Sequence, residues 1–145
     1  MIPGRPLPNT SPIVWHKQIR YRIELSAVEA QRCDRTSACD LDVTVSSVEG
    51  GEKPKTYRGP NDTDSWEPRY ALVESTDEAE LLRGFNFEVA DRNLTFSRIL
   101  GRCQVRVDQR RLKSVGETPE RRARWTEMCG KAQIRLTLTA EDAQP

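Results

Sequence analysis

The clearest pattern in the chain is a period of two between apolar and polar positions. From residue 18 to residue 27, apolar side chains such as Ile19, Tyr21 and Ile23 alternate with charged ones such as Arg20 and Arg22. Successive side chains of a β-strand point to opposite faces, so this alternation predicts a strand with one buried face. Strands are also predicted in six further segments, at residues 41–45, 53–57, 66–73, 85–89, 103–107 and 134–138.

The segments between these strands carry turn and cap signals. Gly50-Gly51 marks a turn. Residues 75–78 have the S-x-x-E spacing of a capping box, which predicts a helical turn through residue 82. Residues 108–130 are polar and irregular, and the Thr-Pro pair within them favours a short helix over 118–125.

Short strands separated by turn signals favour antiparallel sheets packed face to face. Four prolines in the first twelve residues favour an extended tail over 1–14. We predict a single domain over 15–141 and a short C-terminal tail over 142–145. The predicted fold class is all-β, an antiparallel Greek-key β-sandwich of about seven to eight strands.

Charge is segregated along a chain whose net charge is only +1. Residues 61–91 hold nine acidic side chains, whereas residues 102–124 hold eight basic ones. Such asymmetry places an anion-seeking patch on a nearly neutral protein, although an ordinary solvated face has the same composition. Phospholipid headgroups or an acidic protein suit this patch, and nucleic acid is disfavoured because the segment lacks interleaved aromatic residues. The predicted basic surface consists of Arg106, Arg110, Arg111, Lys113, Arg121, Arg122 and Arg124.

The cysteines leave two interpretations open. Cys33, Cys39, Cys103 and Cys129 are either four buried thiols or two disulfides, and four cysteines allow three connectivities. A bridge between the sixth strand and the approach to the last would join Cys103 to Cys129, and another would staple Cys33 to Cys39. Disulfides favour an extracellular, periplasmic or membrane-surface location, and reduced thiols favour a peripheral membrane protein of the cytoplasm. Zinc is disfavoured because the chain has no C-x-x-C pair.

Two loops resemble those of a known family. Asp34 and Asp40 lie six residues apart, and residues 39–45 resemble the segment S-D-P-Y-V-x-V of C2 domains, without its Pro and Tyr. Residues 64–70, D-S-W-E-P-R-Y, are similar to the family's N-P-x-W-N-E-x-F. Residues 89–93, V-A-D-R-N, are similar to its third loop, V-x-D-x-D. The resemblance covers about residues 19–140 and implies the calcium- and lipid-binding sandwich of protein kinase C and synaptotagmin.

The resemblance implies a calcium cluster at one tip of the sandwich. Its ligands would be Asp34, Asp40, Asp91 and Asn93, since calcium takes six to eight oxygen ligands. The sequence departs from the family pattern because Asn93 replaces an aspartate and Arg98 falls where the last aspartate would be. Two outcomes stay open, a single weak calcium ion or a calcium-free loop in which Arg98 neutralises the carboxylates.

The third loop also predicts a membrane-docking tip. Leu94 and Phe96 stand beside Arg92 and Arg98, and apolar side chains flanked by cations suit shallow insertion between anionic headgroups. The alternative is that Phe96 folds back onto the core.

Catalysis is not predicted. The only histidine, His16, follows the proline-rich tail, and the chain has no G-x-S-x-G, Walker A or H-E-x-x-H motif. No apolar run approaches the ~20 residues that a membrane span needs. We therefore predict a non-catalytic module that binds membranes at its loop tips. The alternative is a protein-interaction or adhesion sandwich that is independent of calcium.

Overall fold

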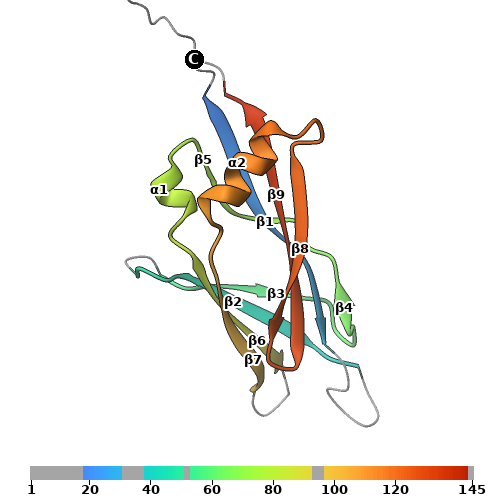
Figure 1. Ribbon diagram of the computed structural model, residues 1–145. Helices are drawn as coiled ribbons and strands as arrows, with labels where there is room; N and C mark the ends of the chain where they lie inside the picture. The colour runs from blue at the N-terminus through green and yellow to red at the C-terminus, as the bar shows by residue number, and fades with distance from the viewer. Residues whose placement is uncertain (1–17, 31–37, 51–52, 93–96, 144–145) are drawn as a thin grey trace, which may run out of the picture.

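The computed structural model describes residues 18–30, 38–50, 53–92 and 97–143. The predicted N-terminal tail, His16, Cys33, Asp34 and the loop residues Asn93, Leu94 and Phe96 lie outside this described part. Two antiparallel sheets and two short helices make up the structure (Figure 1). Neither helix of the described chain has the length and apolar character needed to cross a membrane.

The larger sheet holds five strands in the order β4-β1-β9-β8, with β5 pairing beside β4 on the same edge of β1. Its central strands β1 and β9 pair along almost their whole length, and β8 forms the far edge. The strands are β1 (Ile19–Ala30), β4 (Ser65–Trp66), β5 (Tyr70–Ser75), β8 (Arg122–Cys129) and β9 (Ala132–Asp142).

The smaller sheet holds four strands in the order β3-β2-β6-β7. It packs against only part of the larger sheet, and the helices lie beyond its edge (Figure 1). Its strands are β2 (Leu41–Ser47), β3 (Lys55–Arg58), β6 (Phe85–Arg92) and β7 (Ser97–Val105), and the helices are α1 (Glu78–Leu81) and α2 (Gln109–Glu117).

Two apolar cores follow from this arrangement. Between the sheets, the inward residues of the alternating strands, such as Val43, Phe87 and Leu136, are almost fully buried. Where the smaller sheet does not reach, α2 covers the inner face of the larger sheet with Leu112 and Val115. This second core buries the apolar face of α2 and the part of the larger sheet beneath it. It explains why the inward residues of β1 and β9 are apolar along the full length of both strands.

A disulfide and a close backbone approach join the two sheets at one edge. Cys103 on β7 is bonded to Cys129 on β8, with their Cα atoms 4.8 Å apart. The amide of Lys131 donates to the carbonyl of Leu100 at 3.0 Å. The disulfide between Cys103 and Cys129 is one of the two pairings that the sequence left open. Cys39 is also disulfide-bonded, but the predicted pairing with Cys33 lies outside the described residues.

Alternation along the sequence predicted most of the strands, and the all-β sandwich is confirmed. The predicted helical turn is also present as α1, although its N-cap is Asp77, whose side chain accepts from Ala79 N. The prediction of one strand over 66–73 is wrong, because the chain breaks at Pro68 into β4 and β5.

The interpretation of residues 108–130 as irregular, with a helix over 118–125, is also wrong. A helix instead precedes the Thr-Pro pair, since Asp108 caps α2 by accepting from Arg111 N, and α2 ends before Thr118. Residues 122–129 form the edge strand β8. The alternation of apolar and polar residues in β8 is obscured because the inward side chain that follows Trp125 is the charged Glu127. The Glu127 carboxylate accepts a hydrogen bond from the Trp125 indole nitrogen at 3.1 Å.

Candidate functional site

The candidate loop site lies where β2 begins and β6 ends. These strands pair with Leu41 opposite Asp91, which brings residue 40 beside residues 91 and 92. The amide of Asp40 donates to Asp91 Oδ1 at 2.9 Å, and the amide of Arg92 donates to the Asp40 carbonyl at 2.7 Å. Two of the four predicted calcium ligands are therefore adjacent. The other two, Asp34 and Asn93, lie outside the described residues.

Arginines face the carboxylates of this site. Asp91 is 5% exposed, and Arg98 Nη2 lies 3.8 Å from its Oδ2 atom. Arg92 forms a salt bridge with Asp42, and Arg58 lies 3.5 Å from the same Asp42 oxygen. Burying a carboxylate without a partner is costly, and here guanidinium groups face both carboxylates.

A third connection, residues 59–64, completes this end of the sandwich. The amide of Asp62 donates to Asp40 Oδ1 at 2.7 Å, and the amide of Cys39 donates to Asp64 Oδ1 at 2.8 Å. Asn61 Oδ1 accepts from Arg92 at 2.8 Å. Sequence analysis did not assign Asp62 or Asp42 to the site. The excess of acidic residues in 61–91 was the available signal for Asp62.

The donors described here do not by themselves fit a calcium ion. Asp40 and Asp91 each use one carboxylate oxygen to accept a backbone amide, and Arg98 approaches the second oxygen of Asp91. Within the described residues, no cluster of three or more potential metal ligands occurs. A calcium site at this end would need further ligands, and the remaining predicted ones, Asp34 and Asn93, lie outside the described residues.

The same end of the molecule exposes two large apolar side chains. Ile99 near the start of β7 is 44% exposed, and Met128 near the end of β8 is 59% exposed. The hydrogen bond from Lys131 to Leu100 holds the turn after β8 against β7. Ile99 pairs with Ala90 on the smaller sheet and Met128 pairs with Gln133 on the larger sheet, so the two side chains lie on different sheets along the edge where β7 and β8 meet. Exposed cations, Arg98 and Lys131, accompany them. Apolar and cationic side chains of both sheets are therefore exposed near this end of the domain.

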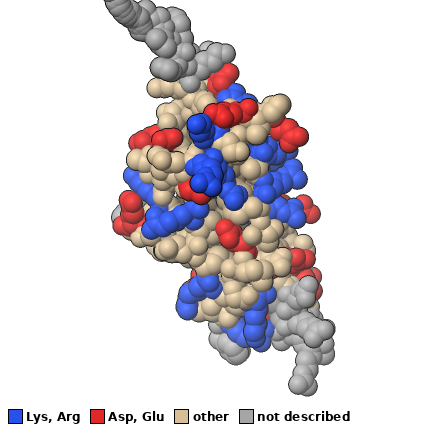
Figure 2. Space-filling model, viewed as in Figure 1, with Lys and Arg blue, Asp and Glu red and all other residues tan. Residues whose placement is uncertain are grey.

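The predicted basic surface is divided by the larger sheet. Figure 2 shows Lys and Arg side chains gathered over the region of α2 and β8. Arg110 and Lys113 are exposed on α2, which covers the inner face. Arg122 and Arg124 instead share the outer face of the sheet with Thr137.

Three other members of the predicted basic surface have structural partners. Arg111 stacks over the ring of Trp125, with its guanidinium carbon 4.1 Å from the ring centroid. Arg121 forms an ion pair with Asp142 at 2.9 Å, and Arg106 donates to the carbonyl of residue 83 at 3.2 Å. These three arginines therefore contribute to the packing of the upper half of the domain.

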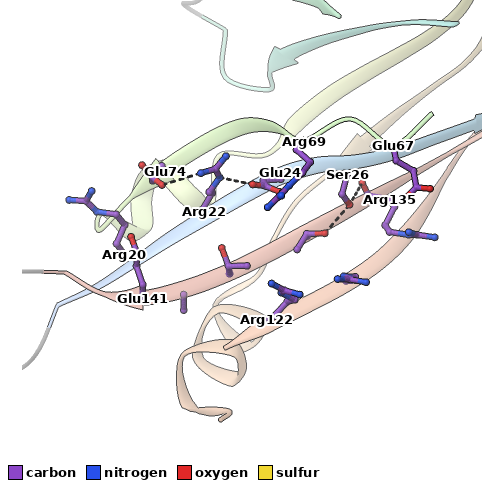
Figure 3. A pocket seen from close by; sticks show the side chains of 14 residues that line it. Arg20, Arg22, Glu24, Ser26, Glu67, Arg69, Glu74, Arg122, Arg135 and Glu141 are labelled. Carbon is purple, nitrogen blue, oxygen red and sulfur yellow. Dashed lines mark hydrogen bonds and ion pairs between the residues drawn. The ribbon is translucent and has the colours of Figure 1, made fainter. Parts of the chain in front are cut away.

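The outer face of the larger sheet is hollowed into a groove of about 560 Å³ (Figure 3). Its floor includes Glu24 and Thr137, which are 8% and 7% exposed. Sequence analysis assigned Arg122 and Arg124 to the predicted basic surface but did not assign Arg135, because the strand β8 that brings them together was not predicted. The charged residues around it are Arg20, Arg22, Glu24, Glu67, Arg69, Glu74, Arg122, Arg124, Arg135 and Glu141.

Comparisons with known proteins show the fold. No family model and no curated protein matches the chain. A solved structure of a C2 domain is similar with a TM-score of 0.53 and 15% identity, covering 84% of this chain and 97% of that one. A C2 domain of plant extended synaptotagmin 1 has a TM-score of 0.59 and 13% identity, covering 89% of this chain and 98% of that one.

Human GIVD cytosolic phospholipase A2 is also similar, with a TM-score of 0.59 and 11% identity. The match covers 87% of this chain but only 18% of the phospholipase chain, so the likeness concerns a small part of that enzyme. Sequence identities of 11–15% establish the fold alone, and the two antiparallel sheets described above agree with that fold. The protein therefore folds as a divergent C2-like β-sandwich domain.

Proposed function

We propose that this domain is a non-catalytic binding module that docks on anionic membranes through its loop end. The observation that carries the proposal is that Ile99 and Met128 are exposed near the loop end, on the two sheets that meet there, together with the cations Arg98 and Lys131. Side chains of this kind insert between headgroups while nearby cations meet anionic lipid. The predicted tip residues Leu94 and Phe96 belong to the connection between β6 and β7, which starts and ends at this same end.

The expected strength is that of reversible attachment. Burying one Ile or Met side chain contributes roughly 1.5–3 kcal/mol. Each cation near an anionic surface adds about 1 kcal/mol. Ile99 and Met128 are 44% and 59% exposed, so insertion buries about half of each side chain, and Arg98 already faces Asp91. The two apolar side chains and Lys131 therefore supply roughly 2.5–4 kcal/mol before the cost of association is subtracted, which suits weak, reversible attachment.

The proposal does not require calcium. In the calcium-binding C2 domains that the sequence resembles, the bound cation offsets the repulsion between crowded carboxylates. Here Arg92 and Arg98 already face Asp42 and Asp91. Guanidinium groups are always charged at neutral pH, so they neutralise these carboxylates without a metal ion. Binding in the presence of a chelator is the expected result.

Vesicle co-sedimentation tests the proposal. The full chain is mixed with phosphatidylcholine vesicles with or without phosphatidylserine, in calcium and then in chelator. Sedimentation with the anionic vesicles in both conditions is expected. Absence of sedimentation in both conditions refutes membrane docking and leaves a protein partner for the Ile99 and Met128 surface. Sedimentation only with calcium refutes the arginine-neutralised mode and supports ligation by Asp34 and Asn93.

A matched pair of variants locates the surface. Ile99→Ser combined with Met128→Ser removes both exposed apolar side chains and is expected to weaken sedimentation. Thr76→Ser with Gln109→Ser changes two exposed polar positions beside α1 and at the start of α2, away from the loop end, and is expected to leave sedimentation unchanged. Equal sedimentation of both variants contradicts the assignment to the loop end.

A further inference from the structure

We infer that the groove on the outer face of the larger sheet is a second binding site, whose ligand is a compact, multiply charged phosphate. This site is separate from the loop end, and the inference does not depend on the proposed membrane docking. It rests on how three arginines from β8 and β9 are placed and on the absence of carboxylate partners for them in the described chain.

The register of the sheet brings the three arginines together. Arg122 lies opposite Thr139, Arg124 lies opposite Thr137, and Arg135 lies opposite Thr126. Residues directly opposite each other in an antiparallel pair point to the same face. Arg122 and Arg124 are two residues apart on one strand, which separates their Cα atoms by roughly 7 Å. Arg124 and Arg135 form a diagonal pair on neighbouring strands, at a similar separation. Three long side chains at these spacings can reach one anion.

The charges of the groove are divided between its two sides. On the β1 side, Arg22 lies 2.7 Å from Glu24 and 3.9 Å from Glu74, and Arg69 lies 4.0 Å from Glu24. Figure 3 shows Arg22 joined to Glu74 and Glu24, whereas no such contact reaches Arg122. The β1 side is thus close to neutral.

On the β8 side the arginines are exposed and lack such partners. Arg122, Arg124 and Arg135 form no ion pair with any carboxylate of the residues that the structure describes. Like charges this close repel, which disfavours the arrangement unless an anion is present. The remaining acidic residues of the groove are Glu67, which follows β4, and Glu141, which lies near the end of β9 opposite Arg20.

Phosphate fits these donors better than a carboxylate-bearing partner. A guanidinium group forms two parallel hydrogen bonds with a phosphate, and several guanidinium groups can share its oxygens. Hydroxyl groups lie on the floor between the arginines, with Thr137 donating to Ser26 at 2.8 Å and Thr139 beside Arg122. The volume of about 560 Å³ is that of a small-molecule site. A phosphorylated headgroup or a free organic phosphate carries the required chemistry.

Calorimetric titration of the full chain with inorganic pyrophosphate tests the inference. Saturable binding is expected at low ionic strength. Arg122→Gln combined with Arg124→Gln should reduce the affinity roughly tenfold or more, because a hydrogen bond to a charged group is worth about one decade in affinity. Arg135→Gln, on a different strand, should reduce it as well. A urea midpoint for each variant confirms that the fold is retained.

The matched control removes the same charge elsewhere. Arg110→Gln combined with Lys113→Gln neutralises two exposed cations on α2, on the other side of the sheet. This control is expected to bind pyrophosphate as the parent protein does. Lack of saturable binding by the parent protein overturns the inference. Equal losses in the groove and control variants also overturn it, because they indicate only nonspecific attraction by net charge.

Vesicles distinguish the two sources of phosphate. The groove variant is sedimented with phosphatidylcholine vesicles that contain phosphatidic acid. Loss of both pyrophosphate affinity and sedimentation indicates a lipid headgroup as the ligand. Loss of pyrophosphate affinity alone indicates a free phosphate. The Ile99→Ser and Met128→Ser variant keeps its pyrophosphate affinity if the groove is independent, so failure of either proposal is recognised separately.

Discussion

Substitution of Gly101 tests how tightly the two sheets are joined. This glycine lies on β7, next to the turn between β8 and β9. A methyl group built at its Cα would overlap the carbonyl group of Cys129 and lie 2.7 Å from the Cα atom of Gly130. The obstruction is backbone on both counts, so no side-chain rotation can relieve it. Gly101→Ala must push the two sheets apart.

The magnitude follows from what opposes that movement. The disulfide between Cys103 and Cys129 and the hydrogen bond from Lys131 to Leu100 hold the strands together on either side of the glycine. Overpacking of a closed contact costs about 1–3 kcal/mol. Loss of one hydrogen bond adds about 1 kcal/mol. We expect Gly101→Ala to lower the free energy of unfolding by about 3 kcal/mol.

Urea denaturation measures the effect. With a slope of about 1.5 kcal/mol per molar, the midpoint should fall by roughly 2 M at an unchanged slope. Gly50→Ala is the control. Gly50 has a φ of +75° but no atom within 4 Å of an added methyl group, so only the left-handed backbone costs energy, about 1–2 kcal/mol. A midpoint for Gly101→Ala at or above that of Gly50→Ala would refute the close junction.

Three further predictions concern the second core and the disulfide. Burial, reinforced by the nearby Glu78 carboxylate, raises the pKa of Tyr21 above its ordinary 10.0. The stability linked to this group is therefore complete below pH 10.0 and falls as the pH rises above it. Urea midpoints measured on either side of that pH should show less alkaline loss for Tyr21→Phe, which also lacks the hydrogen bond to the Leu112 carbonyl. Leu112→Ala, at a site with 0% exposure, should cost about 2–5 kcal/mol in a urea titration, and a loss under 1 kcal/mol would contradict a packed second core. Replacing Cys103 and Cys129 by serine opens a loop with a sequence separation of 26, which should lower the unfolding free energy by about 3.5 kcal/mol in chemical denaturation, whereas an unchanged midpoint would show that the bridge adds nothing.

Much of the loop end could be predicted because it depends on strand ends and short spacings. Once two alternating segments are paired as antiparallel strands, the residue before one strand and the residue after the other lie at the same end of the sheet. Asp40 and Asp91 meet in this way across β2 and β6. Asp62 was not predicted, because its backbone reaches Asp40 only through the path of a separate loop.

The region between β7 and β9 could not be predicted in the same way. Helix α2 has only two buried residues, Leu112 and Val115, so its apolar face is too narrow to stand out among polar neighbours. Strand β8 lies at the edge of its sheet and exposes Arg122 and Arg124, which removes the apolar signal of a central strand. Helix α2 is fixed by the inner surface of β1 and β9 that it covers, and β8 is fixed by its pairing with β9.

The sequence by itself determined the all-β class and most of the strands, because the two faces of a strand alternate along the chain and one of them must leave water. It also determined the acidic and basic segments. Only the tertiary structure decided that Arg98 faces Asp91 and that Arg135 shares a face with Arg122 and Arg124. The physical reason is that ion pairing and charge clustering depend on distances of a few ångströms between residues far apart in the chain, and the register of the sheets sets those distances.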